Sequence, residues 1–246
     1  MNLFLIIPTY NESENLPALA EAVFALAIPS LSILVVDDNS PDGTGRIADE
    51  LAARYSGRLF VHHRPGKIGF ASAYTSGFRI ALDHGADVIG QMDCDFSHPP
   101  EKISELLKAL DQADIAVGSR YIPGGSLDRD WPIWRKALSR FGNWYARSIL
   151  SLPLRDVTGG FRLWKRAVLE ALPLEEIRSN GYVFQVEMAY VAHRMGFQFG
   201  EVPFYFAERR FGSSKMNLRI QLEAAFRVWQ LPGIYRRLRA ALPGRR

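Results

Sequence analysis

The chain has 246 residues, 48% of them hydrophobic and 23% charged, which is typical of a folded globular protein and excludes a disordered one. The formal charge of +4 suits a nucleic acid, a membrane surface or an anionic substrate as partner. The single cysteine, Cys94, excludes an internal disulfide and a cysteine-rich zinc site, and it favours a reducing compartment.

Strand and helix patterns alternate through the first half of the chain. Continuous apolar runs predict buried strands at residues 3–7, 31–36, 59–62, 87–92 and 115–118. Helical patterns lie between them, at residues 14–26, 43–55, 71–82 and 100–110. This alternation is typical of parallel βαβ units, so we expect an α/β fold with a doubly wound, mostly parallel sheet.

The pattern changes after Tyr121. A loop follows, and apolar and aromatic residues then recur at helical spacing over residues 131–152, with cationic residues between them. Residues 182–195 predict another helix, and residues 197–206 predict a strand that is interrupted by Pro203. Residues 218–242 form a basic amphipathic pattern that we expect to be broken or kinked at Pro232.

No segment of the sequence is suited to crossing a membrane. The apolar run at residues 3–7 is too short for a signal peptide and has no basic region before it. No other stretch reaches the roughly 20 apolar residues that span a bilayer. We therefore expect a cytoplasmic protein whose membrane contact is peripheral, on the cytoplasmic face.

Ligands of open α/β sheets bind beyond the carboxyl ends of the strands. Three segments of this chain occupy such positions, namely residues 8–12, 37–43 and 93–99. An NAD-dependent enzyme would show a glycine-rich G-x-G-x-x-G turn after its first strand, and residues 8–12 contain no glycine. The sequence thus argues against dinucleotide binding and directs attention to the polar residues of these segments.

Two aspartates follow the predicted strand at residues 87–92. Asp93 and Asp95 are two positions apart, so their carboxylates point the same way if the chain stays extended. Such a pair is self-repelling unless a cation joins it, and Mg²⁺ or Mn²⁺ prefers carboxylate and phosphate oxygens. The pattern favours a metal that bridges to a diphosphate; the alternative is a solvated loop with capping acids.

The first two strands also end in polar residues. Asp37 and Asp38 open a turn, where an acid can accept hydrogen bonds from a ribose or a base. After the first strand, Tyr10 could stack on a base and Glu12 could hydrogen-bond to it. The alternatives are an ordinary turn in the first case and a plain helix start in the second.

These segments together resemble the signature of inverting family 2 glycosyltransferases. The matching motifs are, in chain order, Pro8-Thr9-Tyr10-Asn11-Glu12, Val35-Val36-Asp37-Asp38-Asn39-Ser40-Pro41-Asp42-Gly43, Asp93-Cys94-Asp95, Gly118-Ser119-Arg120-Tyr121, Thr158-Gly159-Gly160-Phe161-Arg162, Gly181-Tyr182-Val183-Phe184-Gln185, Glu201-Val202-Pro203 and Gly212-Ser213-Ser214-Lys215. They extend to about Met216 and most resemble the polyprenol-phosphate mannosyltransferase branch of the family.

The resemblance implies a GT-A fold, which is a Rossmann-like sheet flanked by helices, and inverting transfer of mannose from GDP-mannose to a polyprenyl phosphate. It implies nucleotide-sugar binding by Pro8, Tyr10, Glu12, Val35, Asp37, Asp93, Cys94, Asp95, Arg120, Arg209 and Lys215. Asp93 and Asp95 would bind the metal, Mg²⁺ or Mn²⁺. Catalytic roles would fall to Asp95, Arg120, Arg209 and Lys215. The family usually has alanine at the position of Cys94, which is a small-for-small change.

A phosphate acceptor changes what the site must supply. A phosphate monoester has a second pKa of about 6 and is largely a dianion at neutral pH, so it needs positioning and positive charge rather than a general base. Of the five histidines only His98 lies near the paired aspartates, and we expect it to have a loop role. Glu187 could orient a hydroxyl or a basic residue, or could be structural.

The helix predicted at residues 131–152 has two interpretations. Arg135 and Ser139 share one of its faces and, with Arg120, form a candidate pocket for the acceptor phosphate. Aromatic residues interleaved with cations suit a membrane interface. The alternative is a helix that packs its aromatic stripe on the sheet. The same ambiguity applies to residues 218–242.

We therefore expect a catalytic domain over residues 1–216, including the interfacial helix, and a basic amphipathic helix and tail over residues 217–246. The chain carries no nucleic-acid-binding motif, so its expected partners are GDP-mannose, a polyprenyl phosphate and a membrane surface. A membrane protein partner and a homo-oligomer stay open. The alternative enzyme uses UDP-glucose or another sugar nucleotide, and the alternative outside enzymes is an inactive nucleotide- or lipid-binding module.

Overall fold

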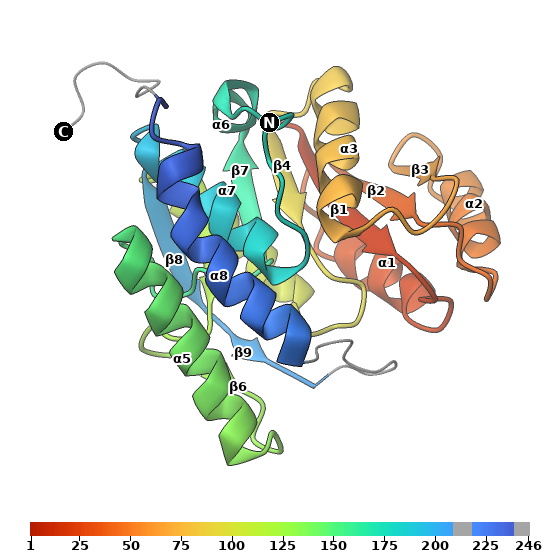
Figure 1. Ribbon diagram of the computed structural model, residues 1–246. Helices are drawn as coiled ribbons and strands as arrows, with labels where there is room; N and C mark the ends of the chain where they lie inside the picture. Colours follow the sequence, from red (N-terminus) through yellow and green to blue (C-terminus); the bar gives the residue numbers. More distant parts are fainter. Residues whose placement is uncertain (209–217, 239–246) are drawn as a thin grey trace.

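The computed structural model describes residues 1–208 and 218–238. Its centre is a seven-stranded sheet with strand order β3-β2-β1-β4-β7-β5-β8, covered by helices on both faces (Figure 1). The strands run parallel except β7, which is antiparallel to both of its neighbours. The expected α/β fold with a mostly parallel sheet is confirmed.

The sheet is formed by β1 (Leu3–Thr9), β2 (Leu31–Asp37), β3 (Leu59–His63), β4 (Val88–Gln91), β5 (Ile115–Ser119), β7 (Arg162–Lys165) and β8 (Phe199–Pro203). A separate parallel pair consists of β6 (Ser126–Leu127) and β9 (Tyr205–Phe206). The helices are α1 (Leu16–Phe24), α2 (Thr44–Arg54), α3 (Phe70–Asp83), the 3₁₀ turn η1 (Pro100–Lys102), α4 (Ile103–Ala109), α5 (Ile133–Leu150), α6 (Arg166–Ala171), α7 (Tyr182–Arg194) and α8 (Leu218–Ile234).

The continuous apolar runs of the strands arise because both faces of the sheet are covered. In β1, Leu3, Leu5 and Ile7 belong to a core with α1, α2 and α4. The alternate residues Phe4 and Ile6 belong to a second core with α3, α7 and α8. Strands enclosed on both sides lose the alternation of apolar and polar residues, which is why the run predicted a buried strand.

Several elements differ from the sequence prediction. Strand β7 was not predicted, because the buried Arg162 interrupts its apolar pattern. Helix α8 includes Pro232 and ends at Ile234, so it is not broken at Pro232 and it stops before residue 242. By contrast, the strand expected over residues 197–206 is interrupted at Pro203 as predicted, because β8 ends there and β9 follows.

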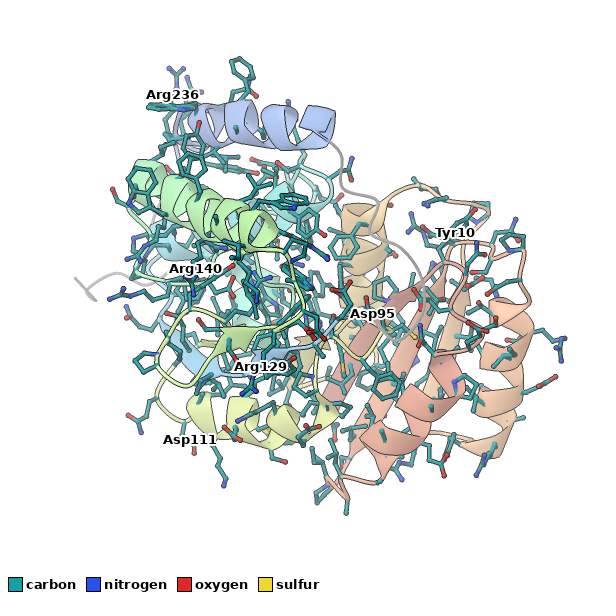
Figure 2. All side chains as sticks on the ribbon, turned by 90° about the horizontal axis from the view of Figure 1, so that it is seen from below. Tyr10, Asp95, Asp111, Arg129, Arg140 and Arg236 are labelled. Atoms are coloured by element: carbon teal, nitrogen blue, oxygen red, sulfur yellow. The ribbon has the colours of Figure 1, made fainter. Side chains whose placement is uncertain are left out.

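Helices α5 and α8 lie side by side on the outside of the molecule (Figures 1 and 2). Trp229 Nε1 on α8 donates to the hydroxyl of Tyr145 on α5 at 2.7 Å, and that hydroxyl donates to the backbone oxygen of Ala225 at 3.2 Å. The Tyr235 hydroxyl, just past α8, donates to Glu187 on α7 at 2.8 Å. Within the described ranges, no helix has the length and apolar character needed to cross a membrane.

Candidate active site

Three parallel strands end together at one edge of the sheet. Thr9 at the end of β1 lies opposite Asp37 at the end of β2, and β4 pairs with β1 up to Gln91. The segments at residues 8–12, 37–43 and 93–99 therefore leave the sheet side by side. Figure 2 looks onto this end of the molecule, with Asp95 near the middle and Tyr10 over the N-terminal half.

Asp37 is the centre of a closed hydrogen-bond network. Its Oδ1 accepts from the hydroxyls of Thr9 at 2.8 Å and Ser40 at 2.6 Å, and its Oδ2 accepts from the Ser40 backbone N–H at 3.0 Å. A Cβ on Gly45 would lie only 3.1 Å from Oδ2, so α2 can approach because this residue is glycine. The network fixes the Asp37 carboxylate at the junction of β1 and β2.

Asp38 has a partner that was not predicted. Arg64 Nη1 lies 2.8 Å from Asp38 Oδ1, and both side chains are buried. Burial raises the pKa of Asp38, although Arg64 beside it acts in the opposite direction. Arg64 also donates to the Gly69 backbone oxygen and to the Ser72 hydroxyl, so it ties the turn after β2 to the start of α3.

Tyr10 and Glu12 follow β1 at the same edge. Lys67 Nζ lies 3.9 Å from the centre of the Tyr10 ring, which is a cation–π contact. Glu12 Oε2 accepts from Asn15 Nδ2 at 2.8 Å, and the Thr44 hydroxyl accepts from the Glu12 backbone N–H at 2.9 Å. An aromatic ring, an acid and a lysine thus lie together where the nucleoside was expected to bind.

Pro8 and Val35 are within the strands rather than beyond them. Pro8 is the penultimate residue of β1 and pairs with Val36. Val35 is completely buried in β2, among the apolar residues beneath α1 and α2. Because this side chain is buried, Val35 can affect a nucleotide site only by positioning the strand that carries Asp37.

The paired aspartates lie on a tight turn after β4. Asp95 is buried, and its Oδ1 accepts from the Ser97 backbone N–H at 3.0 Å and from the Ser97 hydroxyl at 2.6 Å. The Tyr74 hydroxyl on α3 is 3.5 Å from Asp93 Oδ1. Cys94 is buried between the two acids, and burial raises the pKa of its thiol, so the sulfur stays protonated.

His98 holds this turn in place through contacts of its ring. Its Nδ1 accepts a hydrogen bond from the Asp93 backbone N–H at 3.0 Å, and its ring stacks on Phe161 with centroids 5.0 Å apart. Burial lowers the pKa of His98, although Asp93 and Asp95 oppose this effect. A neutral imidazole whose Nδ1 is occupied cannot accept a proton from a substrate, and the contacts are those of a residue that holds a loop.

Arg120 is held by a buried carboxylate. Its Nε and Nη2 each donate to Asp156 at 2.7 Å, and Nη2 also donates to the Thr158 hydroxyl at 2.9 Å. Burial alone would lower the pKa of Arg120, but Asp156 raises it on balance, so the guanidinium keeps its charge. Because Nε and Nη2 are engaged, Nη1 is the nitrogen that remains to contact a phosphate.

The other two residues of the expected acceptor pocket lie on α5. The hydroxyls of Ser139 and Tyr121 share a hydrogen bond of 2.6 Å, which places Ser139 beside the residue that follows Arg120. Arg135 stacks over Trp131, with 3.6 Å from Cζ to the ring centre, and lies 3.2 Å from Glu208. The structure therefore brings Ser139 close to Arg120, while Arg135 is engaged by Trp131 and Glu208.

The chain is similar to known proteins in both sequence and fold. The model of a family described as "Glycosyl transferase family 2" matches residues 4–172. The chain belongs to glycosyltransferase family 2. The enzymatic nature and the family expected from the sequence motifs are confirmed.

Two curated relatives of this glycosyltransferase match almost the whole chain. A polyprenol monophosphomannose synthase of Mycolicibacterium smegmatis is 46% identical over 97% of this chain and 90% of its own length. An undecaprenyl-phosphate mannosyltransferase of Micrococcus luteus is 45% identical over 98% of this chain and 99% of its own length. The similarity therefore includes the segments of the site on both halves of the chain.

Solved structures with the same fold are more distant in sequence. Glucosyl-3-phosphoglycerate synthase from Mycobacterium tuberculosis, crystallised with Mn²⁺, UDP and phosphoglyceric acid, has a TM-score of 0.67 at 15% identity, covering 95% of this chain and 78% of that one. The same synthase with Mg²⁺ and UDP has a TM-score of 0.64 at 17% identity, covering 95% and 79%. These neighbours confirm the GT-A fold.

The donor set of this glycosyltransferase fits a divalent cation that the substrate helps to bind. Asp93 and Asp95 offer carboxylate oxygens, and Mg²⁺ commonly takes one or two carboxylates and completes its shell with substrate phosphates and water. In the part of the chain that is described, no group of three or more His, Cys, Asp or Glu side chains could hold a metal ion. A metal at Asp93 and Asp95 would thus depend on diphosphate oxygens as further ligands.

Of the predicted residues Arg209, Lys215 and Glu187, the structure describes only Glu187. Arg209 and Lys215 lie outside the described residues. Glu187, for which an orienting and a structural role were both open, is completely buried and accepts from the Ser179 backbone N–H at 2.7 Å and from the Tyr235 hydroxyl. It joins α7 to the chain after α8, which is a structural role.

Four residues near the site were not predicted, namely Arg64, Lys67, Tyr74 and Asp156. A signal existed for the first two, because residues 64–67 follow β3 at the same sheet edge as the other polar segments. Tyr74 and Asp156 had no comparable signal. Their roles depend on α3 and on the chain before β7 folding against the site, and such contacts are not visible in local sequence.

Proposed function

We propose that this glycosyltransferase transfers mannose from GDP-mannose to a polyprenyl phosphate, with inversion at the anomeric carbon and release of GDP. The observation that carries the proposal is the identity of 45–46%, over nearly the whole chain, to two relatives whose names both specify mannose and a polyprenol-type phosphate. The site supports it with a polar edge at the ends of β1, β2 and β4, with paired carboxylates, and with an arginine suited to a phosphate nucleophile.

The donor nucleoside would bind at the ends of β1 and β2. Asp37 is oriented by Thr9 and Ser40 to accept from ribose or base groups. The Tyr10 ring offers a stacking surface, and Lys67 above it adds positive charge toward the phosphates. The choice of guanine over uracil rests on the family resemblance and the relatives, and Pro8, Glu12 and Val35 are assigned to the donor on the same basis.

The diphosphate would lie over Asp93 and Asp95. A divalent cation, when bound there, would offset the negative charge that develops on the leaving diphosphate. Ser97 holds the Asp95 carboxylate in a fixed orientation, so little reorganisation is needed during the reaction. We propose that Arg209 and Lys215 add further positive charge, and their assignment rests on the resemblance alone.

The acceptor phosphate would attack from the side of Arg120. A phosphate dianion brings its own nucleophilic oxygen, so no side chain must remove a proton. Asp156 fixes the Arg120 guanidinium, and of the hydrogen-bonded hydroxyls of Tyr121 and Ser139, the one that accepts can donate its own proton to a phosphate oxygen beside it. For Arg135 to join them, its contact with Glu208 would have to be exchanged for the phosphate.

A polyprenyl tail requires a membrane, and α5 and α8 supply a surface for it. Large apolar side chains that point away from the protein define what we term the apolar face: Ile133, Trp134, Leu138, Phe141 and Trp144 on α5, and Phe226 and Trp229 on α8. The Trp229–Tyr145 hydrogen bond joins the two helices, so the face is continuous. We propose that it lies in the interface of the cytoplasmic leaflet, as a peripheral contact.

Covering by another copy of the chain or by a partner protein is the alternative for the apolar face. Aromatic side chains there are far more exposed than a packing stripe would be, with 67% for Trp134, 60% for Trp144 and 63% for Trp229. Tryptophan at a helix surface suits the headgroup region of a bilayer, where one end of the ring is apolar and the other is wet. We therefore favour lipid as the occupant.

A second candidate donor is UDP-glucose, because the structural neighbours that share the fold were crystallised with UDP or UDP-glucose. One experiment separates the two. The purified protein is incubated with a panel of labelled sugar nucleotides, Mg²⁺ or Mn²⁺ and a short polyprenyl phosphate, and glycolipid products are extracted. We expect a mannolipid from GDP-mannose. A glucolipid from UDP-glucose alone would support the second candidate.

A further inference from the structure

A basic cavity lies next to the apolar face. It has a volume of about 340 Å³ and lies between α5, the loop after β5 and the chain that follows α5. Four of the nine residues that line it are arginines, Arg120, Arg140, Arg147 and Arg155, and none is acidic. Arg120 is matched by Asp156, so the other three determine the charge of the cavity.

These three arginines have no carboxylate partner among the described residues. Other arginines do, as Arg64 has Asp38 and Arg166 has Glu170. Arg140, Arg147 and Arg155 form no ion pair with any residue in the described ranges. The nearby acid Glu201 accepts from the backbone N–H of residue 155, not from its guanidinium. The cavity thus gathers three positive charges without a protein counterion.

The cavity and the apolar face share a residue. Trp144 lines the cavity and is 60% exposed on the apolar face. Arg140 and Arg147 are seven residues apart on α5, which is two turns and about 10 Å along the axis. Apolar rings with arginines along one flank are the arrangement by which an interfacial helix contacts acyl chains and phosphates together.

The cavity adjoins the proposed acceptor position, because Arg120 and Tyr121 line it, and its other arginines extend along α5 and beyond. Figure 2 shows Arg140 beside α5, clear of Asp95. Arg147 is two turns further along α5, and Arg155 lies beyond the end of that helix. A phosphate held toward Arg147 and Arg155 would therefore lie beside the acceptor phosphate, which must reach the sugar over the paired aspartates, rather than in its place.

We propose that this cavity binds the phosphate group of an anionic membrane phospholipid and so fixes the orientation of the enzyme on the bilayer. Guanidinium groups bind phosphate through paired hydrogen bonds, and three of them around one cavity suit a single anionic headgroup. The apolar face would then hold the acyl chains of the same leaflet. This inference rests on the proposed function only in requiring that the enzyme works at a membrane.

The test compares two variants of equal charge. The cavity variant is R140Q/R147Q/R155Q, and the control is R46Q/R54Q/K108Q, which removes three exposed cations on α2 and α4, two helices that contribute no residue to the cavity. Each protein is sedimented at low salt with vesicles of phosphatidylcholine, with and without phosphatidylglycerol. We expect the cavity variant to lose roughly tenfold to a hundredfold in partitioning onto the anionic vesicles. The control should lose no more than about threefold, because its charges act only at long range.

A second arm separates lipid binding from catalysis. Transfer from GDP-mannose to a short, water-soluble prenyl phosphate is measured without vesicles, and both variants should keep the wild-type kcat/KM. Loss of kcat/KM in the cavity variant alone would mean that the cavity holds the acceptor phosphate and would overturn the inference. Equal vesicle binding by the two variants would overturn it as well. A wild-type protein that binds anionic vesicles but transfers no mannose would reject the proposed function and leave the inference standing.

Discussion

The donor edge and the apolar face are built in opposite ways. At the donor edge, Asp37, the last residue of β2, is buried and already satisfied by three hydrogen bonds within the protein. On the apolar face, rings such as those of Trp134 and Trp229 are more than half exposed and have little of the protein against them. One region is organised before a ligand arrives, and the other needs a partner outside the chain to cover it.

The difference is clearest on α8, which has both kinds of surface. Val228 and Leu231 face inward and are buried, and Tyr235 is anchored to Glu187. Phe226 and Trp229 are 68% and 63% exposed. The inner residues attach the helix to the body, so the exposed ring positions are held rather than mobile. The apolar face, which we propose contacts the membrane, is therefore attached to the body of the protein through the inner residues of α8.

The largest expected effect lies at the donor edge. Asp95→Ala removes a carboxylate that the metal and diphosphate would need, and we expect transfer to fall by about a thousandfold or more. We expect the fold to be kept, and the melting curve measures this, because Asp95 bonds to Ser97 within its own turn. Asp111→Ala, at an exposed acid on another surface, serves as the control and should keep full activity.

The next effect concerns stability. Asp156→Ala would leave Arg120 buried without its carboxylate, and breaking such a pair costs about 3–5 kcal/mol. Urea unfolding measures the change. Asp49→Ala breaks an exposed contact with His63 and should cost less than about 1 kcal/mol. If the two variants are equally stable, Asp156 is not what holds Arg120 in place.

A third pair of variants compares the inner and outer surfaces of α8. Leu231→Ala on the inner surface should lower the free energy of unfolding by about 2–5 kcal/mol. Trp229→Ala on the apolar face should leave it within about 1 kcal/mol and instead weaken sedimentation with vesicles. A large loss of stability in Trp229→Ala, with unchanged vesicle binding, would assign the apolar face to protein packing.

The smallest effect is expected at Lys67. Replacing it with Met removes the cation over Tyr10 and its positive charge near the donor phosphates, and we expect donor affinity to fall by roughly twofold to fivefold, which corresponds to about 0.5–1 kcal/mol. Calorimetric titration with GDP-mannose and Mg²⁺ measures the Kd. Lys102→Met, on the 3₁₀ turn η1, is the matched control. An unchanged Kd for the Lys67 variant would remove this residue from the donor site.

The two regions also differ in how far sequence could predict them. The donor edge was predictable because apolar runs mark β1, β2 and β4, and parallel strands place their following residues together. The direction of the α5 stripe was not, because helical spacing of aromatics is the same whether they face a sheet or a membrane. The burial of each side chain in the structure shows the direction of the stripe. Asn143 and Ala146 face inward, whereas Trp134 and Trp144 face outward.

Strand β7 shows a second limit of local pattern. Arg162 and Trp164 are both completely buried in it, and Arg162 donates to backbone oxygens of Gln185 and Val157, each at 2.8 Å. Burial lowers the pKa of Arg162 to about 10, although Asp156 opposes this effect. An arginine whose charge is satisfied by distant backbone groups cannot be recognised as a core residue from its neighbours in sequence.

The most direct test of the account is the transfer reaction itself. Purified protein is mixed with GDP-mannose, Mg²⁺ or Mn²⁺ and a short polyprenyl phosphate, and the product is measured with and without excess EDTA and against UDP-glucose as donor. We predict a polyprenyl phosphate mannose that forms only with the metal and only from GDP-mannose. Full activity in excess EDTA, or product from UDP-glucose alone, would contradict the account.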